Sequence, residues 1–368
     1  MTTNGAQEST EPTRPDGPVF VVGSMRSGST MLRLIVDSHP RIAIGAETGF
    51  MGAVLATKRI PNWKYGDEWH QRIEWSDAEL DDRIRSFYDG MFSRYAAARG
   101  KARWGEKTPF HTSHIAAMAD VFPTSTFVGI VRHPGAVATS LRKSFHYTFE
   151  DALSYWSATN LDMLRAASTL GDRFAMCRYE DLVTSGEPVL RELMETIGEE
   201  FSPNLLQHHV VQRDQGAPRV VDGSTSTRDA IDATRADRWA DEASDADRVA
   251  LESTRDLADF FGYAAASSAE RAPIEGSSGR RWTWTGDDLA RRRKEFADRV
   301  DFESRPPTLA IDADPEELAR RLTQVEAALS RTRSRRAVQL VDAIRKAQRQ
   351  RSWQEVKRVW RIARGKSS

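Results

Sequence analysis

The chain has 368 residues, 39% of them hydrophobic, and its 53 Lys and Arg residues balance 53 Asp and Glu residues, so it can form one large α/β domain with an extension, or two domains. Cys177 is the only cysteine, which excludes an intrachain disulfide bond and favours a reducing compartment. No apolar stretch is long enough to span a bilayer and the N-terminus lacks a hydrophobic signal region, so we expect a cytoplasmic protein.

The first expected element follows a polar stretch, residues 1–16, that we expect to be disordered. It is a buried strand at Val19–Val22, and a turn from Gly23 to Gly28 leads from it into a helix that begins at Ser29. Backbone N–H groups at such a helix start converge on an anion, so this segment predicts a phosphate-binding loop.

The loop differs from that of a nucleoside triphosphatase. Its frame is G-x-x-x-x-G-Ser-Thr, and Ser29 stands where the lysine that reaches the β- and γ-phosphates would be. Arg26 lies inside the loop instead. We therefore expect an anion other than a magnesium triphosphate, although a P-loop kinase stays an alternative.

The next elements alternate between strands and helices. Strands are expected at 41–46, 126–131 and 173–178. Helices are expected at 135–141, 149–170, 189–197 and 247–263, and residues 51–103 carry apolar residues at helical spacing. This alternation predicts an α/β fold, with a parallel sheet flanked by helices and ligands at the carboxyl ends of its strands.

The domain boundaries follow from composition. Residues 17–263 form the expected catalytic domain, 264–285 a linker rich in small residues, and 286–368 a helical, basic C-terminal extension. The polar segment 207–238 lacks periodicity, and a segment of this length either covers a site or is disordered.

Charge is concentrated in the tail. Residues 331–368 carry thirteen Lys and Arg against two acidic residues, a net charge of +11. Tail residues on one helical face are Trp353, Val356, Trp360 and Ala363. This pattern is typical of a helix on an anionic membrane surface or of a patch for an acidic glycan, and a solvated basic helix is the alternative. Nothing in the chain resembles a base-reading motif, so we do not expect nucleic acid as a partner.

A second anion-seeking group follows the strand at 126–131. Arg132 stands where a P-loop enzyme commonly places an aspartate for magnesium, and Ser140 lies eight residues further, able to face the same side. Two such sites, without a carboxylate suited to magnesium, predict a nucleotide with phosphates at two positions.

Here a family resemblance becomes specific. Arg26-Ser-Gly-Ser-Thr30 resembles the 5′-phosphosulfate loop of the PAPS-dependent sulfotransferases, and Arg132-His-Pro-x-x-Val-x-x-Ser140 resembles their 3′-phosphate motif. With Arg178-Tyr-Glu-Asp-Leu-Val183, the similarity covers about residues 18–263. The resemblance implies the P-loop-like sulfotransferase fold and 3′-phosphoadenosine-5′-phosphosulfate (PAPS) as donor, with no metal.

The resemblance also implies donor-binding residues. Those at the 5′ end would be Arg26, Ser27, Gly28, Ser29 and Thr30. Arg132 and Ser140 would hold the 3′-phosphate, and Tyr179 would lie near the nucleotide. Arg228, in the polar segment, is a further candidate for the 3′-phosphate.

Among the subgroups, the tyrosylprotein, glycan-type and bacterial members are the most similar. They have a glutamate after a His-Pro element and a lysine in a Lys-x-Pro turn, which correspond here to Glu47 and Lys107. The resemblance implies Glu47 as general base and Lys107 as the cation at the bridging oxygen, with Arg26 as a further catalytic cation. Glu106 is a rival for the base.

The expected function is transfer of a sulfuryl group from PAPS to an acceptor hydroxyl on a glycan, a lipid-linked sugar or a natural product. Sulfation of a peptide tyrosine is the alternative, and a non-catalytic nucleotide-binding or tethering protein is the alternative from another class. The acceptor pocket is expected from residues 48–103 and the segment after 207. Its candidate aromatic residues are Trp63, Tyr65, Trp69 and Trp75.

Overall fold

The computed structural model describes residues 16–60, 63–221, 225–227, 229–263, 269–279 and 282–303. The chain separates into a compact unit, Met1–Pro306, and a second unit, Pro307–Ser368. The second unit lies outside the described residues, and so do the basic tail 331–368, Arg228 and all but one residue of the N-terminal stretch predicted to be disordered.

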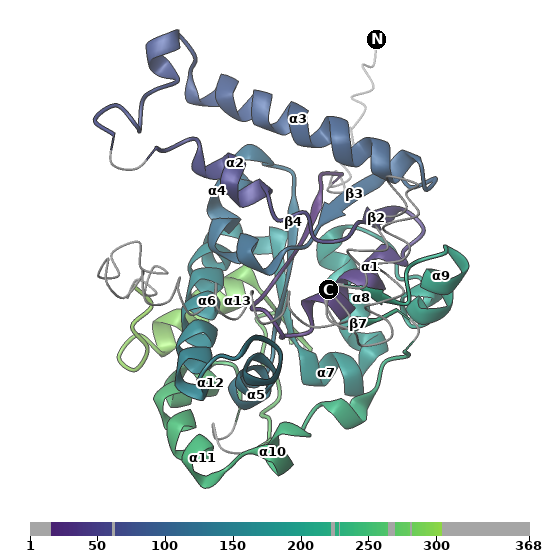
Figure 1. The fold of residues 1–368 in the computed structure, drawn as a ribbon, viewed down its shortest axis with the longest axis vertical. Coiled ribbons are helices and arrows are strands. Elements are labelled where there is room, and N and C mark those ends of the chain that lie inside the picture. The colour runs from purple at the N-terminus through teal and green to yellow at the C-terminus, as the bar shows by residue number, and fades with distance from the viewer. Residues whose placement is uncertain are drawn as a thin grey trace, which may run out of the picture. The chain divides into compact units, whose positions relative to one another are not determined.

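Among the described residues, six strands form one sheet in the order β2-β3-β1-β4-β5-β8. Their bounds are β1 Val19–Val22, β2 Ile42–Ile44, β3 Arg103–Glu106, β4 Thr126–Val131, β5 Phe174–Arg178 and β8 Thr283–Thr285. The first five strands run parallel, and β8 pairs antiparallel with β5. Figure 1 labels β2, β3 and β4 of this sheet among the surrounding helices. A separate two-stranded sheet pairs β6, Val220–Val221, antiparallel with β7, Thr225–Ser226.

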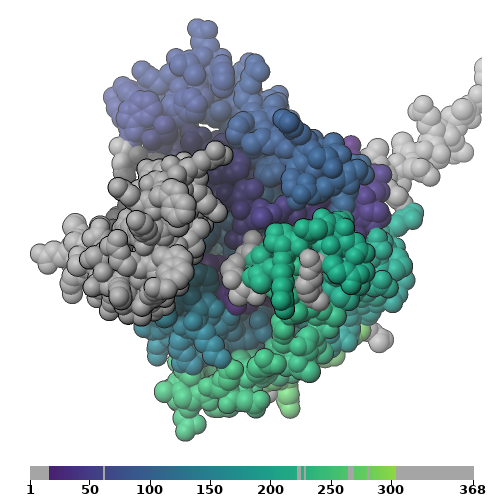
Figure 2. All heavy atoms as spheres, turned by 45° about the vertical axis from the view of Figure 1, so that its right-hand side comes forward, coloured from purple at the N-terminus to yellow at the C-terminus, as the bar shows by residue number. Residues whose placement is uncertain are grey.

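Helices flank this sheet, and Figure 2 shows the described residues with all their heavy atoms, in the same colours along the chain. Their bounds are α1 Ser29–Asp37, α2 Met51–Ala56, α3 Asp77–Ala97, α4 Ile115–Val121, α5 Pro134–Phe145, α6 Phe149–Leu170, α7 Tyr179–Thr184, α8 Gly186–Ile197, α9 His208–Asp214, α10 Trp239–Glu242, α11 Asp245–Leu251, α12 Arg255–Phe260 and α13 Gly286–Glu295. Two 3₁₀ turns matter for the site, Pro109–His114 after β3 and Ala233–Arg235 before α10. None of the helices in the described part of the chain is long and apolar enough to cross a membrane.

The core lies on both faces of the sheet. Successive side chains of a strand point to opposite faces, so Val19 and Val21 join one apolar cluster and Phe20 and Val22 the other. The first cluster continues into α1, α7 and α8, and the second into α3, α4, α6 and α13. Burial on both faces explains why β1 and β4 are continuous apolar runs, as is usual for parallel sheets.

The α/β class, with a parallel sheet flanked by helices, is confirmed. Two strands of the six-stranded sheet have no counterpart in the sequence analysis. Arg103–Glu106 (β3) lacks an apolar run, and Thr283–Thr285 (β8) lies in the segment 264–285 that we expected to be a linker. Because β8 pairs with β5 and α13 packs against α6, the sheet unit extends past the boundary that we placed at residue 263.

Candidate active site

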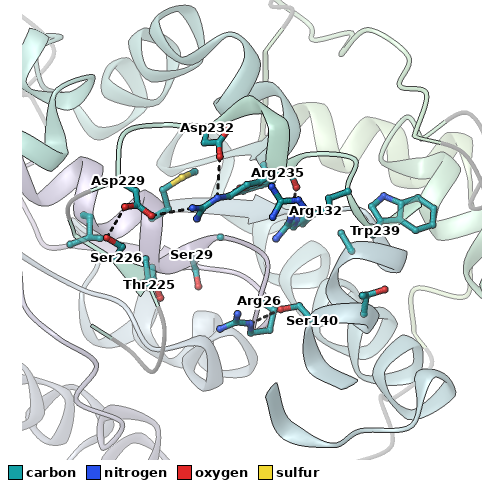
Figure 3. Close-up of a pocket in the computed structure, with 18 of the residues that line it drawn as sticks. Arg26, Ser29, Arg132, Ser140, Thr225, Ser226, Asp229, Asp232, Arg235 and Trp239 are labelled. Carbon is teal, nitrogen blue, oxygen red and sulfur yellow. Dashed lines mark hydrogen bonds and ion pairs between the residues drawn. The ribbon is translucent and has the colours of Figure 1, made fainter. Parts of the chain in front are cut away.

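A cavity of about 370 Å³ lies where three parallel strands end. Residues that follow β1, β4 and β5 line it, including Arg26, Arg132 and Tyr179. Figure 3 shows Arg26 and Arg132 on this cavity. Parallel strands that meet at one edge bring these segments together, as expected for a ligand site in a parallel sheet.

The turn between β1 and α1 has an unusual backbone. Gly23, Arg26 and Gly28 have φ angles of +151°, +66° and +98°. A non-glycine residue such as Arg26 adopts this left-handed region at a cost that the surrounding structure must support. Because no side chain caps the start of α1 within the described residues, its first N–H groups are available to an anion.

Ser27 differs from its neighbours in this turn. Its hydroxyl is buried and donates a hydrogen bond to the carbonyl of Ser24 at 2.7 Å. Gly28, Ser29 and Thr30 line the cavity, whereas Ser27 does not. The structure therefore gives the Ser27 side chain a role in shaping the turn.

The two predicted phosphate motifs meet at Arg26 and Ser140. Arg26 Nε donates a hydrogen bond to Ser140 Oγ at 2.8 Å (Figure 3). Burial lowers the pKa of the Arg26 guanidinium, and the nearby charge of Arg132 lowers it further. Two cations on one cavity repel each other, so an anion bound between them would be stabilised.

Arg132 is held from two sides. Its guanidinium lies 4.1 Å from the centroid of the Tyr179 ring, and Nη2 donates to the backbone carbonyl of Arg235 at 2.9 Å. Its Nε is buried and has no hydrogen-bond partner among the described residues. A phosphate oxygen would supply that acceptor, so the site fits a phosphate group.

Lys107 and Glu47 come together beside the same turn. The Lys107 side chain, which follows β3, is fully buried, and its Nζ donates to Thr30 Oγ1 at 2.9 Å. The same Nζ forms an ion pair with the Glu47 carboxylate, whose side chain is 32% exposed. Since Thr30 also lines the cavity, it joins the Lys107–Glu47 pair to the anion-binding turn.

Glu106, the rival candidate for the base, is buried. Its buried carboxylate accepts hydrogen bonds from Thr48, Thr108 and His111. Arg228, the further candidate for the 3′-phosphate, lies outside the described residues. Other residues of the segment 207–238 line the cavity, although the sequence analysis did not group them: His208, Thr225, Ser226, Asp229, Asp232, Arg235 and Arg238.

The sequence analysis did not identify several residues that line the cavity. Arg235 is held by Asp229 and Asp232 at 3.1 and 3.2 Å, and no pattern marked it. Lys143 lies three residues after Ser140 on α5, a helical spacing that could have indicated it. Tyr155 does not line the cavity but supports its loop: it accepts a hydrogen bond from the backbone N–H of Met25 at 2.9 Å across 130 residues, a separation at which sequence carries no signal.

No cluster of three or more His, Cys, Asp or Glu side chains in the described part of the chain is arranged to hold a metal ion. The cations and hydroxyl groups that line the cavity include those of Arg26, Arg132, Lys143, Ser29 and Thr30.

Residues 18–203 match the model of the sulfotransferase family. The chain belongs to that family. The family resemblance of its motifs is thereby confirmed.

Curated relatives of this sulfotransferase-family chain include protein-tyrosine sulfotransferase 1 of Danio rerio, 25% identical over 52% of this chain and 55% of the relative. Protein-tyrosine sulfotransferase 2 of Gallus gallus is 27% identical over 52% and 53%. The nodulation protein NoeE of Sinorhizobium fredii is 29% identical over 35% and 32%. The chain spans about half the length of the first two relatives.

Among solved structures, this chain is similar to the sulfotransferase domain from the Synechococcus PCC 7002 olefin synthase. It is 23% identical, with a TM-score of 0.47, and the match covers 67% of this chain and 96% of that domain.

Proposed function

We propose that this chain transfers a sulfuryl group from PAPS to an acceptor hydroxyl and releases adenosine 3′,5′-bisphosphate. The observation that carries the proposal is the double contact of Thr30. This residue lines the cavity that holds Arg26 and Arg132, and it accepts a hydrogen bond from Lys107, the partner of Glu47. The proposed site for two phosphates is thus continuous with a cation and a carboxylate.

In this proposal the donor lies with its 5′ end on the start of α1. Gly28, Ser29 and Thr30 supply helix-start N–H groups and hydroxyls there, and Arg26 adds its charge. Arg132 and Ser140 hold the 3′-phosphate, with Tyr179 beside the nucleotide. The unsatisfied Nε of Arg132 and the 2.8 Å contact between Arg26 and Ser140 support this assignment.

The proposed reaction needs a base and a cation. Glu47 accepts the proton of the acceptor hydroxyl while that oxygen bonds to the sulfur atom. The bond from sulfur to the 5′-phosphate oxygen breaks at the same time, and its electron pair stays with the phosphate. Lys107 stabilises the charge that develops on this oxygen, and its full burial strengthens that interaction.

The acceptor pocket is proposed from residues 48–103 and from the segment after residue 207, as the sequence predicts. Trp63 and Trp75 are 49% and 37% exposed, and the Arg72 guanidinium lies 3.8 Å from the centroid of the Tyr65 ring. Exposed rings of this kind suit sugar faces, which favours a glycan, lipid-linked sugar or natural product hydroxyl. The names of the protein-tyrosine sulfotransferase relatives support a peptide tyrosine as the second candidate.

The first test measures nucleotide binding and catalytic turnover separately, in the unaltered protein and in variants of Glu47 and Lys107. Calorimetry should detect binding of adenosine 3′,5′-bisphosphate, and turnover of PAPS should appear with a panel of sugars, phenols and tyrosine peptides. Glu47→Gln and Lys107→Ala should each lower turnover by about 10²–10³-fold and still bind the bisphosphate.

The controls are Glu150→Gln and Lys294→Ala, both at exposed positions, which should keep full turnover. Full activity of a Glu47 or Lys107 variant would remove that residue from the mechanism. Stoichiometric binding of the bisphosphate without turnover of any acceptor would favour the tethering alternative, and thermal stabilisation by magnesium ATP rather than PAPS would favour a kinase.

The basic tail, residues 331–368, has a separate proposed role as a docking segment for an anionic membrane surface or an acidic glycan near the acceptor. Its net charge of +11 supports this. Deletion of residues 331–368 should reduce co-sedimentation with vesicles of phosphatidylserine and phosphatidylcholine, while bisphosphate affinity stays unchanged. Unchanged co-sedimentation would count against membrane docking.

A further inference from the structure

The segment Glu106–Thr112 makes contacts that the proposed reaction does not use. The Glu106 side chain is only 3% exposed, and its Oε1 accepts hydrogen bonds from Thr48 Oγ1 at 3.0 Å and from Thr108 Oγ1 at 2.7 Å. Its Oε2 lies 2.8 Å from His111 Nδ1. An ionised carboxylate is costly to bury unless donors satisfy both oxygens, and here three side chains do so.

These donors come from two segments that hold the candidate catalytic pair. Thr48 follows Glu47, and Thr108 follows Lys107. The Thr108 hydroxyl donates to Glu106 and also accepts a hydrogen bond from the backbone N–H of Gly49 at 3.3 Å. The buried Glu106 carboxylate therefore links the segment that follows Glu47 to the end of β3, next to Lys107.

His111 fixes the carboxylate from the other side. A carboxylate only accepts, so Nδ1 of His111 carries the proton in this contact. Its other ring nitrogen, Nε2, is buried without a hydrogen-bond partner among the described residues. The next residue, Thr112, exchanges hydrogen bonds with the backbone of Gly23 at 3.0 and 3.1 Å, which connects the same 3₁₀ turn to the anion-binding loop.

We propose that Glu106 is a positioning residue: through Thr48 and Thr108 it sets the Glu47 carboxylate against the Lys107 ammonium, and His111 holds it in that orientation. This inference rests on the proposed function for the roles of Glu47 and Lys107. Its physical basis is that a displacement of about 1 Å in a reacting group can cost on the order of 10²-fold in rate.

Glu106 is distinguished from a general base by its surroundings. Both of its oxygens are occupied by donors and its side chain is buried, whereas about a third of the Glu47 side chain is exposed. Glutamine at 106 keeps one acceptor oxygen for Thr48 and Thr108, since its amide has the same shape. Alanine keeps none. A positioning residue is partly rescued by glutamine, and a base is not.

The test compares Glu106→Ala, Glu106→Gln and the control Asp288→Asn. Asp288 is likewise buried and hydrogen-bonded, but at the start of α13, away from the cavity. In turnover of PAPS with the acceptor that works best for the unaltered protein, Glu106→Ala should lower kcat by at least about tenfold. Its KM for PAPS and Kd for adenosine 3′,5′-bisphosphate should stay within about twofold, and Glu106→Gln should recover part of the kcat.

Amide hydrogen exchange provides a readout that needs no activity. Peptides covering residues 45–50 should exchange faster in Glu106→Ala than in the unaltered protein or Asp288→Asn. Unchanged exchange there, or unchanged kcat in Glu106→Ala, would overturn the proposal, and so would equal loss of kcat in the alanine and glutamine variants. If the unaltered protein turns over no acceptor, the proposed function fails, and hydrogen exchange still decides whether Glu106 holds the Glu47 segment.

Discussion

His208 shows at the residue scale how burial controls charge in this cavity. Its side chain lines the cavity, and burial lowers its pKa to about 4, with a smaller contribution from the neighbouring His209. In the unfolded chain the imidazole would titrate near its ordinary value of 6.5. The unfolded state therefore takes up a proton as pH falls below about 6.5, while the folded state stays neutral until about pH 4.

The stabilisation associated with neutral His208 is thus complete above pH 6.5 and is lost as the pH falls towards 4. Between pH 7 and pH 5 it should account for at most about 2 kcal/mol of the free energy of unfolding. Denaturant titrations at both pH values should show a smaller acid-induced loss in His208→Gln than in the unaltered protein. The control is His209→Gln, and an identical loss in both variants would contradict the assignment.

At the element scale, the β1–α1 turn requires glycine at position 28. Gly28 has a φ of +98°, and a Cβ atom built there would lie 2.4 Å from a ring carbon of Tyr179. The turn and α7 therefore approach each other too closely for a side chain at position 28. This close approach lets the start of α1 lie beside the Tyr179 ring.

Gly28→Ala should accordingly lower the free energy of unfolding by roughly 1–3 kcal/mol and weaken bisphosphate binding at least about tenfold. Calorimetry measures the bisphosphate affinity, and denaturant titration measures the free energy of unfolding. Gly90→Ala is the matched control, because a Cβ atom there meets nothing within 4 Å in the middle of α3. It should be neutral or stabilising by roughly 0.5–1 kcal/mol. Equal stability of the two variants would show that the turn tolerates a side chain.

At the scale of the whole molecule, the sheet is completed by residues beyond the predicted boundary at 263. β8 covers the edge of β5, and the buried Trp284 contributes to the core cluster that also contains Phe261. Removing this strand would expose a sheet edge and leave apolar surface without cover.

A chain that ends after residue 306 should therefore keep a cooperative unfolding transition and bind the bisphosphate with unchanged affinity. A chain that ends after residue 263 should unfold at a lower temperature or aggregate. Differential scanning calorimetry and size-exclusion chromatography compare the two. Equal transition temperatures would mean that β8 and α13 contribute nothing to the stability of the sheet unit.

The sequence predicted the elements whose signal is local. β1 and β4 are continuous apolar runs because both of their faces are covered, and α6 has the helical spacing of a long amphipathic helix. β3 and β8 could not be predicted in this way. Arg103 is buried in β3 only because Gly17, Ile197 and Glu199 accept its hydrogen bonds, and these partners lie more than 80 residues away in the chain.

By itself, the sequence determined the fold class and the two anion-seeking motifs, because a turn between a strand and a helix is encoded by adjacent residues. Only the tertiary structure decided that Thr30 connects the cavity to Lys107 and Glu47, and that Arg235 and His208 reach the same cavity. These contacts join strand ends and loops that are distant in the chain, and they form because the parallel sheet brings the carboxyl ends of its strands to one edge.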